Sequence, residues 1–441
     1  MRRLPLALLL LLGALAAGLV ACGGDEPVPA APKAAGGLVP TRVVVPKGMG
    51  AAPLDVPRTL LAPRGARVEV AARVADARFM AFLPDRSLLV SQPGEGQVTR
   101  IAGGRSSVWL SGLDQPHDLV VHRTGGREWI YVTASDRVVR VPYRAGAAQA
   151  GPVDDVVTGL PDASSSELRG TYAHALKNIA LRGDELFVSI ASSCNVCTED
   201  TTSDPVRGAI YRTAADGSGG LSLVQRGVRN AEGLAFLPDG RLWLAINNRD
   251  NIPYPFHRDV TGDGKDDFGQ VVVPYVDDHP PEELTPVRQG GDTGWPYCNP
   301  NPDGGLRDMP FVPDAVLNPG NAVTDCATKD RVAVGIQAHS APLGLTPLTG
   351  TRLPARWRAG LAVAFHGSWN RSKPTGYKLV WFPWAAGATT PGAQRDLLAG
   401  FTANGGAKPW GRPVDAQAGP DGALYVSDDG ANAIYRVTLT R

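Results

Sequence analysis

The sequence predicts an all-β fold, a six-bladed β-propeller, from three observations. The 441-residue chain contains 52 glycines and 38 prolines, which supply many turns, and it shows few long helical periodicities. A strand–turn–strand unit recurs six times. Several copies are followed by a third strand with an apolar–x–Arg–apolar pattern. Repeated short antiparallel sheets of this kind bury their faces between the blades of a propeller. A β-sandwich and a pair of smaller β domains are the alternatives.

Residues 1–22 are typical of a bacterial lipoprotein signal peptide. Arg2 and Arg3 precede a run rich in Leu and Ala, which is short for a stable membrane span. Cys22 ends the tetrapeptide Leu-Val-Ala-Cys, which resembles a lipobox, so we expect Cys22 to carry the lipid as the first mature residue. A plain signal peptide with an incidental cysteine is the alternative.

The rest of the chain divides into a tether and a body. Residues 23–57 are rich in Ala, Pro and Gly without periodicity, which predicts a flexible tether, and residues 58–441 form the propeller. We therefore expect an exported lipoprotein of the periplasm or cell envelope that meets the membrane through its lipid anchor only. With 44 basic and 43 acidic side chains and no basic cluster, nothing indicates a nucleic-acid partner.

Each repeat combines two apolar strands with a turn. The copies lie at residues 79–90, 116–132, 177–188, 227–244, 344–365 and 413–426. The fourth copy contains Pro238-Asp239-Gly240, and its Asp-Gly step suits a tight hairpin because Gly accepts positive φ. The strand at 68–72 is expected to pair with the strand at 434–439 and so to close the ring within the last blade.

A long insertion, about 247–337, separates the fourth and fifth copies and is predicted to lie between blades 4 and 5. Long irregular segments in compact domains are usually functional. The insertion contains Asp259 and Asp263 in a run with oxygen ligands at alternating positions and Gly at the sixth, which resembles a calcium loop. Gln270 stands at the twelfth position where such loops have Glu, and a solvated acidic turn is the alternative.

Four cysteines remain after Cys22, and an even number in an exported protein suggests disulfides. We expect Cys194–Cys197 to form a small local disulfide and Cys298–Cys326 to close a longer loop. The CxxC at 194–197 could also be a redox pair or half of a zinc site. The chain has no second CxxC and no βαβ pattern around this one, which favours the disulfide.

Polar side chains stand where loops enter or leave the repeats, and such junctions at one rim of a β scaffold are where sites are built. They are His174, Arg229, Asn230, His339, His366, Arg371 and Arg412. Converging at the mouth of a central channel, they suit an anionic, planar ligand. Arg binds carboxylates in bidentate fashion, and a neutral His can accept a proton. Each residue taken alone is more often structural.

These motifs resemble the soluble pyrroloquinoline quinone (PQQ) dependent glucose and sorbosone dehydrogenases, and the sorbosone branch more closely. The resemblance covers about residues 68–437. Its strongest matches are Arg229-Asn230, Asn248-Arg249-Asp250, Gly294-Trp295-Pro296-Tyr297, His366-Gly367-Ser368-Trp369-Asn370-Arg371, Trp410-Gly411-Arg412-Pro413 and Ser427-Asp428-Asp429-Gly430. It implies an enzyme that oxidises a small sugar or sugar aldehyde by hydride transfer to PQQ, with Ca²⁺ on the quinone.

The resemblance also implies roles for single residues. His174 matches the general base and Arg229 the arginine beside the reactive quinone carbonyl. The main-chain carbonyls of Asn248 and Arg249 match those that hold the calcium ion. The positions matched to cofactor binding are Asn230, His339, Arg371 and Arg412.

Two departures weaken the match. Ser192 stands where a carboxylate orients the catalytic His in the glucose dehydrogenases, and Val414 stands where a second carboxylate-binding Arg is expected. The family's clamp lysine has no clean match, and Arg371 is the candidate to replace it. The alternative is a non-catalytic, lipid-anchored propeller that binds a carbohydrate or protein partner; a propeller hydrolase or lactonase is a more distant one. The sequence does not indicate the electron acceptor.

Overall fold

The computed structural model describes residues 37–237, 239–403 and 408–439. The expected signal peptide, the expected lipidation site Cys22 and residues 23–36 of the expected tether lie outside the described residues. Within the described part, no helix has the length and apolar character needed to cross a membrane.

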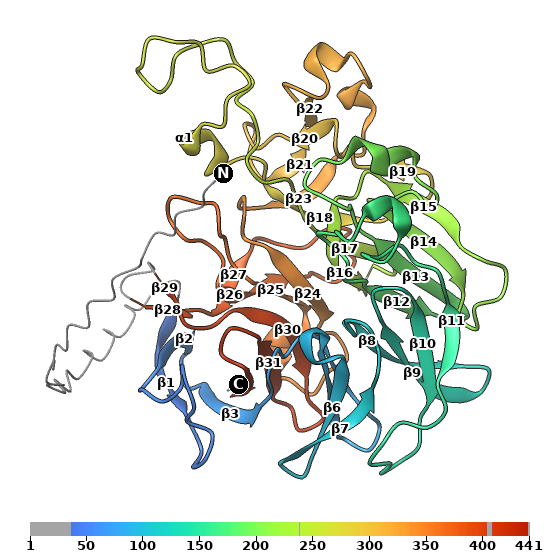
Figure 1. Ribbon diagram of the computed structural model, residues 1–441. Helices are drawn as coiled ribbons and strands as arrows, with labels where there is room; N and C mark the ends of the chain where they lie inside the picture. The colour runs from blue at the N-terminus through green and yellow to red at the C-terminus, as the bar shows by residue number, and fades with distance from the viewer. Residues whose placement is uncertain (1–36, 238, 404–407, 440–441) are drawn as a thin grey trace, which may run out of the picture.

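Six antiparallel sheets surround a common centre, which confirms the predicted six-bladed propeller (Figure 1). Blade one is β4 (Met80–Phe82), β5 (Leu88–Gln92), β6 (Gln97–Ala102) and β7 (Arg105–Ser111). Blade two is β8 (Leu119–Thr124), β9 (Arg127–Thr133), β10 (Val138–Pro142) and β11 (Asp154–Val157). Blade three is β12 (Ile179–Arg182), β13 (Glu185–Ile190), β14 (Ala209–Ala214) and β15 (Ser222–Arg226), extended by β19 (Gly291–Asp292).

The remaining three blades follow in chain order. Blade four is β16 (Asn230–Phe236), β17 (Leu242–Asn247), β18 (Glu282–Pro286) and β23 (Val332–Ile336), with β21 (Arg307–Met309) at its edge. Blade five is β24 (Pro342–Pro347), β25 (Gly360–Phe365), β26 (Lys378–Pro383) and β27 (Arg395–Leu398). Blade six is β30 (Pro413–Ala418), β31 (Leu424–Asp428), β32 (Ala433–Thr438) and β3 (Arg67–Arg73).

The other elements are short. The helices α1 (Val273–Val276) and α2 (Ala355–Arg358) have four residues each. The two-residue strands β28 (Thr402–Ala403) and β29 (Lys408–Pro409) pair with each other. Single 3₁₀ turns lie at Pro93–Glu95, Ser166–Leu168, Thr198–Thr202, Pro319–Asn321 and Cys326–Thr328.

The ring closes as expected, because β3 from the beginning of the described chain pairs antiparallel with β32 from its end. Val68 lies opposite Val437, and Val70 lies opposite Tyr435. Closure of this kind removes the exposed sheet edge that an open array would leave. Both ends of the fold therefore depend on one blade.

The predicted tether is wrong for residues 38–57, which are folded. β1 (Leu38–Val44) pairs antiparallel with β2 (Thr59–Pro63) and parallel with β3, so the closing sheet gains two strands. Leu38, Leu54 and Leu60 are buried against blades five and six. The apolar residues within this Ala/Pro-rich segment provide enough burial to hold it on the propeller.

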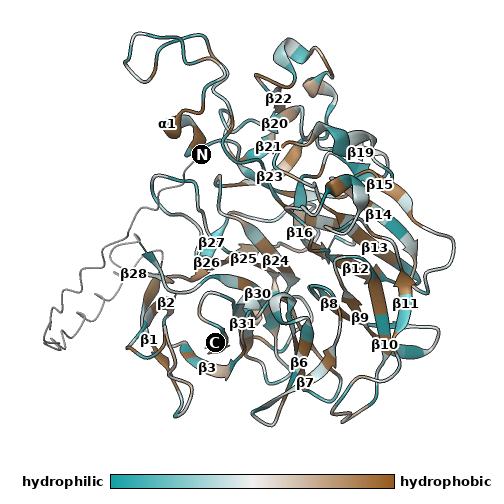
Figure 2. Cartoon of the chain, in the orientation of Figure 1, coloured by the Kyte–Doolittle hydropathy of each residue, from teal (hydrophilic) through white to brown (hydrophobic). Residues whose placement is uncertain are grey.

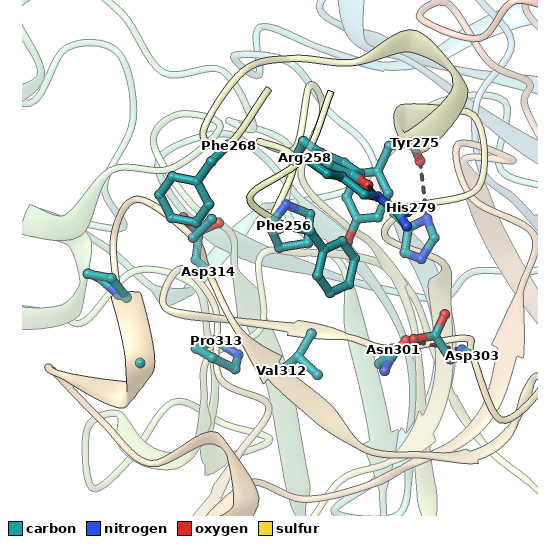
Figure 3. A pocket seen from close by; sticks show the side chains of 15 residues that line it. Phe256, Arg258, Phe268, Tyr275, His279, Asn301, Asp303, Val312, Pro313 and Asp314 are labelled. Atoms are coloured by element: carbon teal, nitrogen blue, oxygen red, sulfur yellow. Dashed lines mark hydrogen bonds between the residues drawn. The ribbon is translucent and has the colours of Figure 1, made fainter. Parts of the chain in front are cut away.

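The insertion lies within blade four, not between blades four and five as predicted. The chain leaves β17, forms an arm (residues 248–281) and returns as β18; it then forms a lobe (residues 287–331) and returns as β23. Neither β18 nor β23 has a hairpin partner next to it in sequence, so no strand–turn–strand pattern marks them. The lobe contains β20 (Cys298–Pro300) paired with β22 (Phe311–Pro313). Arm and lobe project together from the ring (Figure 1) and enclose a cavity (Figure 3).

The hydrophobic core lies between neighbouring blades, and the strands are correspondingly apolar (Figure 2). Trp243 and Leu284 of blade four pack with Leu361 and Phe382 of blade five, and all four are almost completely buried. Burial of one such side chain contributes roughly 1.5–3 kcal/mol. These interfaces hold the inner strands rigidly, so the loops at their ends have a fixed base.

Candidate active site

A cavity of about 160 Å³, here called the rim cavity, lies where loops enter and leave the inner strands of blades three, four and five. It contains both His174 and Arg229, so the two residues expected to carry the chemistry share one site. Its lining is His174, Arg229, Asn230, Asn247, Asn248, Asp250, Glu282, His339, Ala341, Leu343, Gly367, Ser368, Trp369 and Asn370.

His174 is held as a neutral base. Its Nδ1 lies 2.8 Å from the main-chain oxygen of Ser192 and 2.9 Å from the Ser192 hydroxyl. Because a carbonyl oxygen can only accept, Nδ1 carries the hydrogen, and Nε2 is left as the acceptor. Burial, followed by the nearby charge of Arg229, lowers the pKa of His174 to about 4. The position matched to an orienting carboxylate is thus occupied by Ser192, which performs this role with a hydroxyl and a main-chain oxygen.

Arg229 is buried immediately before β16, and every nitrogen of its guanidinium is hydrogen-bonded. Nε donates to the main-chain oxygen of Asn195 at 3.2 Å, and Nη1 donates to that of Asn247 at 3.2 Å. Nη2 lies 2.9 Å from Asn195 Oδ1 and 3.2 Å from Asp250 Oδ2. A cation fixed in this way needs no rearrangement to meet negative charge that develops in the cavity.

The support for Arg229 comes from a disulfide loop. The structure confirms Cys194–Cys197, and this three-residue step contains Asn195. The side-chain oxygen of Asn195 also accepts from Asp250 N at 2.8 Å, while its amide donates to Asp250 O at 2.9 Å. The CxxC therefore anchors the residue that positions both Arg229 and Asp250.

Three further predicted residues line the rim cavity. The Asn230 amide donates to Glu232 at 3.3 Å. Asn248 N donates to Glu282 Oε2 at 2.6 Å. His339 is in the left-handed region with φ of 62°, and its Nε2 lies 2.7 Å from Val276 O at the end of α1. His339 thus binds the arm to the propeller at the edge of the cavity.

The residues fit a hard divalent cation. Glu282 lines the cavity, and Glu283 lies behind it; burial raises the pKa of both to about 8. Across residues 37–237, 239–403 and 408–439, no donor reaches the main-chain oxygens of Asn248 and Arg249. Carboxylate and carbonyl oxygens are the ligands that Ca²⁺ prefers, and a bound cation would favour the ionised carboxylates.

The Asn370 side chain fits a polar ligand. It lines the rim cavity, and both its amide oxygen and its amide nitrogen are buried without a hydrogen-bond partner among the described residues. Buried polar atoms are almost always satisfied, and an unsatisfied one costs roughly 1–3 kcal/mol. A group that both donates to and accepts from Asn370 would remove this cost.

Arg371 and Arg412, which were predicted to bind cofactor carboxylates, do not line the rim cavity. Arg371 Nη2 lies 3.1 Å from Asp278 of the arm. Arg412 Nε and Nη2 donate to the main-chain oxygens of His366 and Gly367 at 3.1 and 3.0 Å. Their hydrogen bonds go to the arm and to the cavity wall instead. The guanidinium of Arg249 likewise faces away and forms an ion pair with Asp314.

The second calcium site predicted at Asp259 and Asp263 lies in the arm, where both carboxylates make local contacts within the turn. Asp259 accepts hydrogen bonds from the main-chain N–H groups of Gly262 and Gly264, at 2.6 and 2.8 Å. Asp263 pairs with Lys265. No group of three or more His, Cys, Asp or Glu side chains arranged for a metal occurs in the part of the chain that the structure describes.

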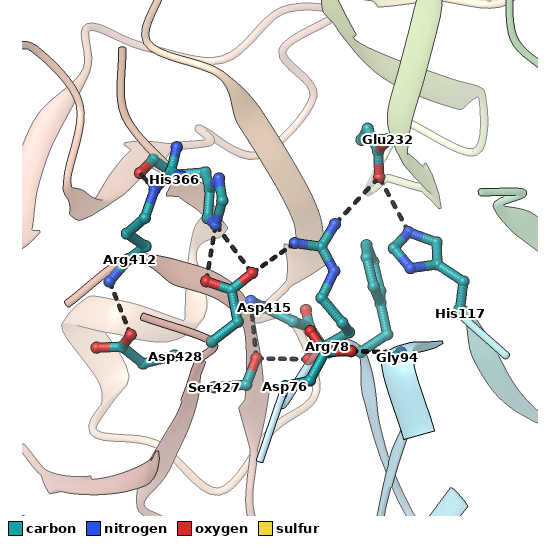
Figure 4. A network of polar contacts seen from close by, with 12 residues as sticks. Asp76, Arg78, Gly94, His117, Glu232, His366, Arg412, Asp415, Ser427 and Asp428 are labelled. Atoms are coloured by element: carbon teal, nitrogen blue, oxygen red, sulfur yellow. Dashed lines mark hydrogen bonds and ion pairs between the residues drawn. The ribbon is translucent and has the colours of Figure 1, made fainter. Parts of the chain in front are cut away.

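A chain of charged groups crosses the central channel next to the rim cavity (Figure 4). Arg78 Nη1 lies 2.8 Å from Asp429, and Arg78 Nη2 lies 3.7 Å from Glu232. Glu232 is 2.9 Å from His117 Nε2, and Asp429 is 2.8 Å from His366 Nε2. Since Asn230 joins Glu232 to the cavity, this central network links the site to five of the six blades.

The sequence reasoning missed most of this network, although the repeats carry a signal for it. Arg78, His117, Lys177 and Glu232 each stand two residues before an apolar residue at the same place in the inner strands of blades one to four. Aligning the repeats on that apolar residue would have revealed a polar position facing the channel. Glu282, by contrast, lies in the insertion, where no repeat indicates its register.

Solved structures of several proteins share this fold. The calcium structure of the Trichoderma reesei carbohydrate-active enzyme family AA12 protein matches with a TM-score of 0.69 and 21% identity, covering 86% of this chain and 97% of that one. The holo form of the pyranose dehydrogenase PQQ domain from Coprinopsis cinerea matches with a TM-score of 0.66 and 21% identity over 86% and 97%. A glucose dehydrogenase structure matches with a TM-score of 0.56 and 16% identity, covering 85% of this chain and 99% of that one.

An uncharacterized protein of Borreliella burgdorferi (strain ATCC 35210 / DSM 4680 / CIP 102532 / B31) is 28% identical over 283 residues, which are 63% of this chain. The match spans 62% of the length of that relative. The TrAA12-like family matches residues 66–440, the whole propeller from β3 to β32. The chain therefore belongs to the TrAA12-like family.

Proposed function

We propose that this protein is a PQQ-dependent oxidoreductase that oxidises a sugar or a sugar aldehyde. The observation that carries the proposal is the rim cavity itself, in which a neutral imidazole with a free Nε2 faces the same space as a fully fixed guanidinium. The family supports a sugar dehydrogenase, and one related structure is named as a PQQ domain of a pyranose dehydrogenase. A sugar such as sorbosone or glucose is the substrate class we expect.

The chain's own residues supply acid–base and electrostatic functions. His174 Nε2 accepts the proton of the substrate hydroxyl, and the resulting imidazolium is stabilised by Ser192, to which Nδ1 already donates. PQQ, when bound, supplies the two-electron acceptor for the hydride. Arg229 stabilises negative charge that develops beside it.

The same walls would hold the cofactor. Asn230 and Asn370 offer amides to a polar ring system, and Asn370 has no other partner among the described residues. Asp250, Glu282 and the main-chain oxygens of Asn248 and Arg249 would hold Ca²⁺. The enclosed volume of about 160 Å³ is below the roughly 300 Å³ of ordinary ligand pockets, so a three-ring cofactor needs the open side as well.

Trp369 marks that open side and is our candidate for contact with the sugar. Trp369 lines the rim cavity yet is 71% exposed, the largest exposed fraction among the exposed large apolar residues described. An aromatic ring kept in solvent at the mouth of a site offers an apolar face to a substrate.

We further propose that the protein is exported and anchored by a lipid on Cys22, in the periplasm or cell envelope. The support is the lipobox-like sequence and the pair of disulfides, since disulfides persist in oxidising compartments.

A non-catalytic propeller that binds a carbohydrate is the second candidate. It is favoured by Arg371 and Arg412, whose guanidiniums are used by the arm and the cavity wall, leaving fewer cations for an anionic cofactor.

Reconstitution distinguishes the two. Full-length protein is mixed with PQQ and Ca²⁺, cofactor absorbance is followed, and dye reduction is measured with a panel of sugars and sugar aldehydes. His174→Ala should abolish turnover while cofactor binding is largely retained. His122→Ala, which changes an imidazole of β8 that hydrogen-bonds to Gly183 O and does not line the rim cavity, should leave turnover unchanged. If the cofactor spectrum does not change and no sugar is oxidised, the oxidoreductase proposal is wrong and the non-catalytic propeller is favoured.

A further inference from the structure

A second cavity borders the rim cavity and belongs wholly to the insertion. This insertion cavity has a volume of about 520 Å³ and is lined only by residues of the arm and the lobe, between Tyr254 and Gly320. It lies within the range of roughly 300–1,000 Å³ that small-molecule sites occupy, unlike the rim cavity. None of its lining residues belongs to a strand of the six blades, so the space is an addition to the propeller.

Its upper wall, as seen in Figure 3, is a set of aromatic rings fixed by one another. Tyr254 packs edge-on against Phe256 at 5.5 Å and against Tyr275 at 5.3 Å, and Tyr275 stacks on His279 at 4.0 Å. Phe256 is nevertheless 50% exposed. A half-exposed ring held in a rigid aromatic cluster is ready to cover an apolar face at no further cost in ordering.

The opposite side carries a few planar polar groups. Asn301 and Asp303 lie together across from the rings (Figure 3), and the Asn301 Oδ1 accepts from Asp303 N at 3.0 Å, which fixes the pair. Arg258 lies beside Tyr254 and Phe256 on the aromatic side. The lining thus combines one amide, carboxylates and one guanidinium with a mostly aromatic and aliphatic surface.

This combination selects one ligand class. The C–H face of a pyranose ring carries weak positive charge and matches the negative face of an aromatic ring, while its vicinal hydroxyls match amide and carboxylate groups. A phosphate or nucleotide would meet Asp303 and Asp314 with only Arg258 as a cation. A purely apolar ligand would cover Asn301 and Asp303 without offering them a hydrogen-bond partner.

The insertion cavity and the rim cavity share a wall. His339 of the rim cavity bonds to the main-chain oxygens of Val276 and His279, at 2.7 and 3.1 Å, and the His279 ring lines the insertion cavity. Arg249 follows the rim residue Asn248 and forms an ion pair with Asp314 on the insertion side. A ligand in one space therefore lies one layer of chain away from the other.

We propose that the insertion cavity is a second carbohydrate site, which holds a pyranose unit of a neutral oligosaccharide beside the rim cavity. The site needs no cofactor, so its sugar binding can be tested separately from the proposed oxidoreductase activity. Its role is to keep a sugar-containing chain close to the position where His174 and Arg229 act.

The test uses the full chain without PQQ and isothermal titration with four neutral oligosaccharide series, β-1,4- and α-1,4-linked glucose, β-1,4-xylose and β-1,4-mannose. At least one series should bind. Phe256→Ala and Asn301→Ala should each weaken binding about tenfold, whereas Phe256→Tyr, which keeps the ring, should bind as the wild type does. Saturation-transfer NMR should show sugar C–H protons receiving magnetisation from aromatic protons.

Three outcomes would overturn the proposal. None of the four series binds; or Phe256→Ala and Asn301→Ala, shown to be folded by circular dichroism, bind with unchanged affinity; or binding is lost in Trp369→Ala but kept in Phe256→Ala, which would place the sugar in the rim cavity.

Discussion

Asn195 joins three segments of the candidate active site. It is the residue through which the Cys194–Cys197 loop contacts both Arg229 and Asp250. Asn195 and Asp250 are 55 residues apart, and no local pattern indicates that they meet. His174 and Arg229 could be selected from the sequence because each lies shortly before the first strand of a repeat. Asn195, Asp250 and Glu282 could not, because their positions depend on how loops of different blades fold against each other.

Replacing Asn195 should impair the site more than the fold. Asn195→Ala leaves a buried Arg229 donor and the Asp250 N–H without an acceptor, each costing roughly 1–3 kcal/mol. We expect kcat of the PQQ-loaded enzyme to fall about 10- to 100-fold, with a weaker effect on the KM of the sugar. Asn195→Asp keeps the acceptor for Arg229 and should recover most of the rate. Equal rates for Asn195→Ala and wild type would show that Arg229 needs no such support.

His174 should titrate far below an ordinary histidine. In the cofactor-free protein, NMR of ring-labelled histidine, assigned with His174→Ala, should give a pKa near 4 because burial and Arg229 disfavour the charged form. In the unfolded chain His174 has a pKa near 6.5, so between pH 4 and pH 6.5 the unfolded chain binds more protons than the folded one. His174 therefore destabilises the fold increasingly as pH falls from about 6.5 to about 4. A titration midpoint near 6.5 would contradict the buried, neutral base.

At the scale of elements, the repeats were predictable and the insertion was not. Each inner hairpin has its apolar strands and turn next to each other in sequence, so the pattern is local. β18 and β23 complete blade four from single strands separated by long segments, so the sequence placed the insertion one boundary too late. β1 was similarly hidden in an Ala/Pro-rich stretch, and only its pairing with β2 and β3 identifies it.

The lobe should depend on its own disulfide. Cys298–Cys326 spans 28 residues, and closing a loop of that length contributes about 3–4 kcal/mol in the chain-entropy view. Cys298→Ser with Cys326→Ser should make residues 287–331 the first site of limited proteolysis, mapped by mass spectrometry. The matched pair Cys194→Ser with Cys197→Ser should leave the lobe as resistant as in the wild type. Unchanged resistance of the first variant would mean that packing on blade four is sufficient.

At the scale of the whole molecule, six sheets form one closed body because β3 seals the ring. The sequence analysis predicted this closure correctly, because it paired the strand at 68–72 with the strand at 434–439. The near balance of 44 basic and 43 acidic residues leaves no large net field, so binding depends on local groups such as the central network.

Two truncations should distinguish the role of β3, which closes the ring, from that of β1 and β2, which are added to it. A chain that begins at residue 64 lacks β1 and β2 but retains β3; we expect a single cooperative melting transition at a lower Tm, because buried Leu38, Leu54 and Leu60 are lost. A chain that begins at residue 74 lacks β3, leaves β32 at an open edge and should not reach the native state. Circular dichroism melts with size-exclusion chromatography measure both. Native-like melting of the shorter chain would show that three strands suffice in blade six.

The tip of the arm, residues 255–268, is a loop whose two ends lie next to each other. Tyr254 N donates to Gln270 O at 2.7 Å, and Gly269 N donates to Tyr254 O at 2.8 Å, so residues 255–268 leave and return at one point. Lengthening such a loop costs little, since each doubling adds only about 0.6 kcal/mol. Mutation and recombination can thus exchange this tip at little cost, while the six-bladed ring beneath it stays the same.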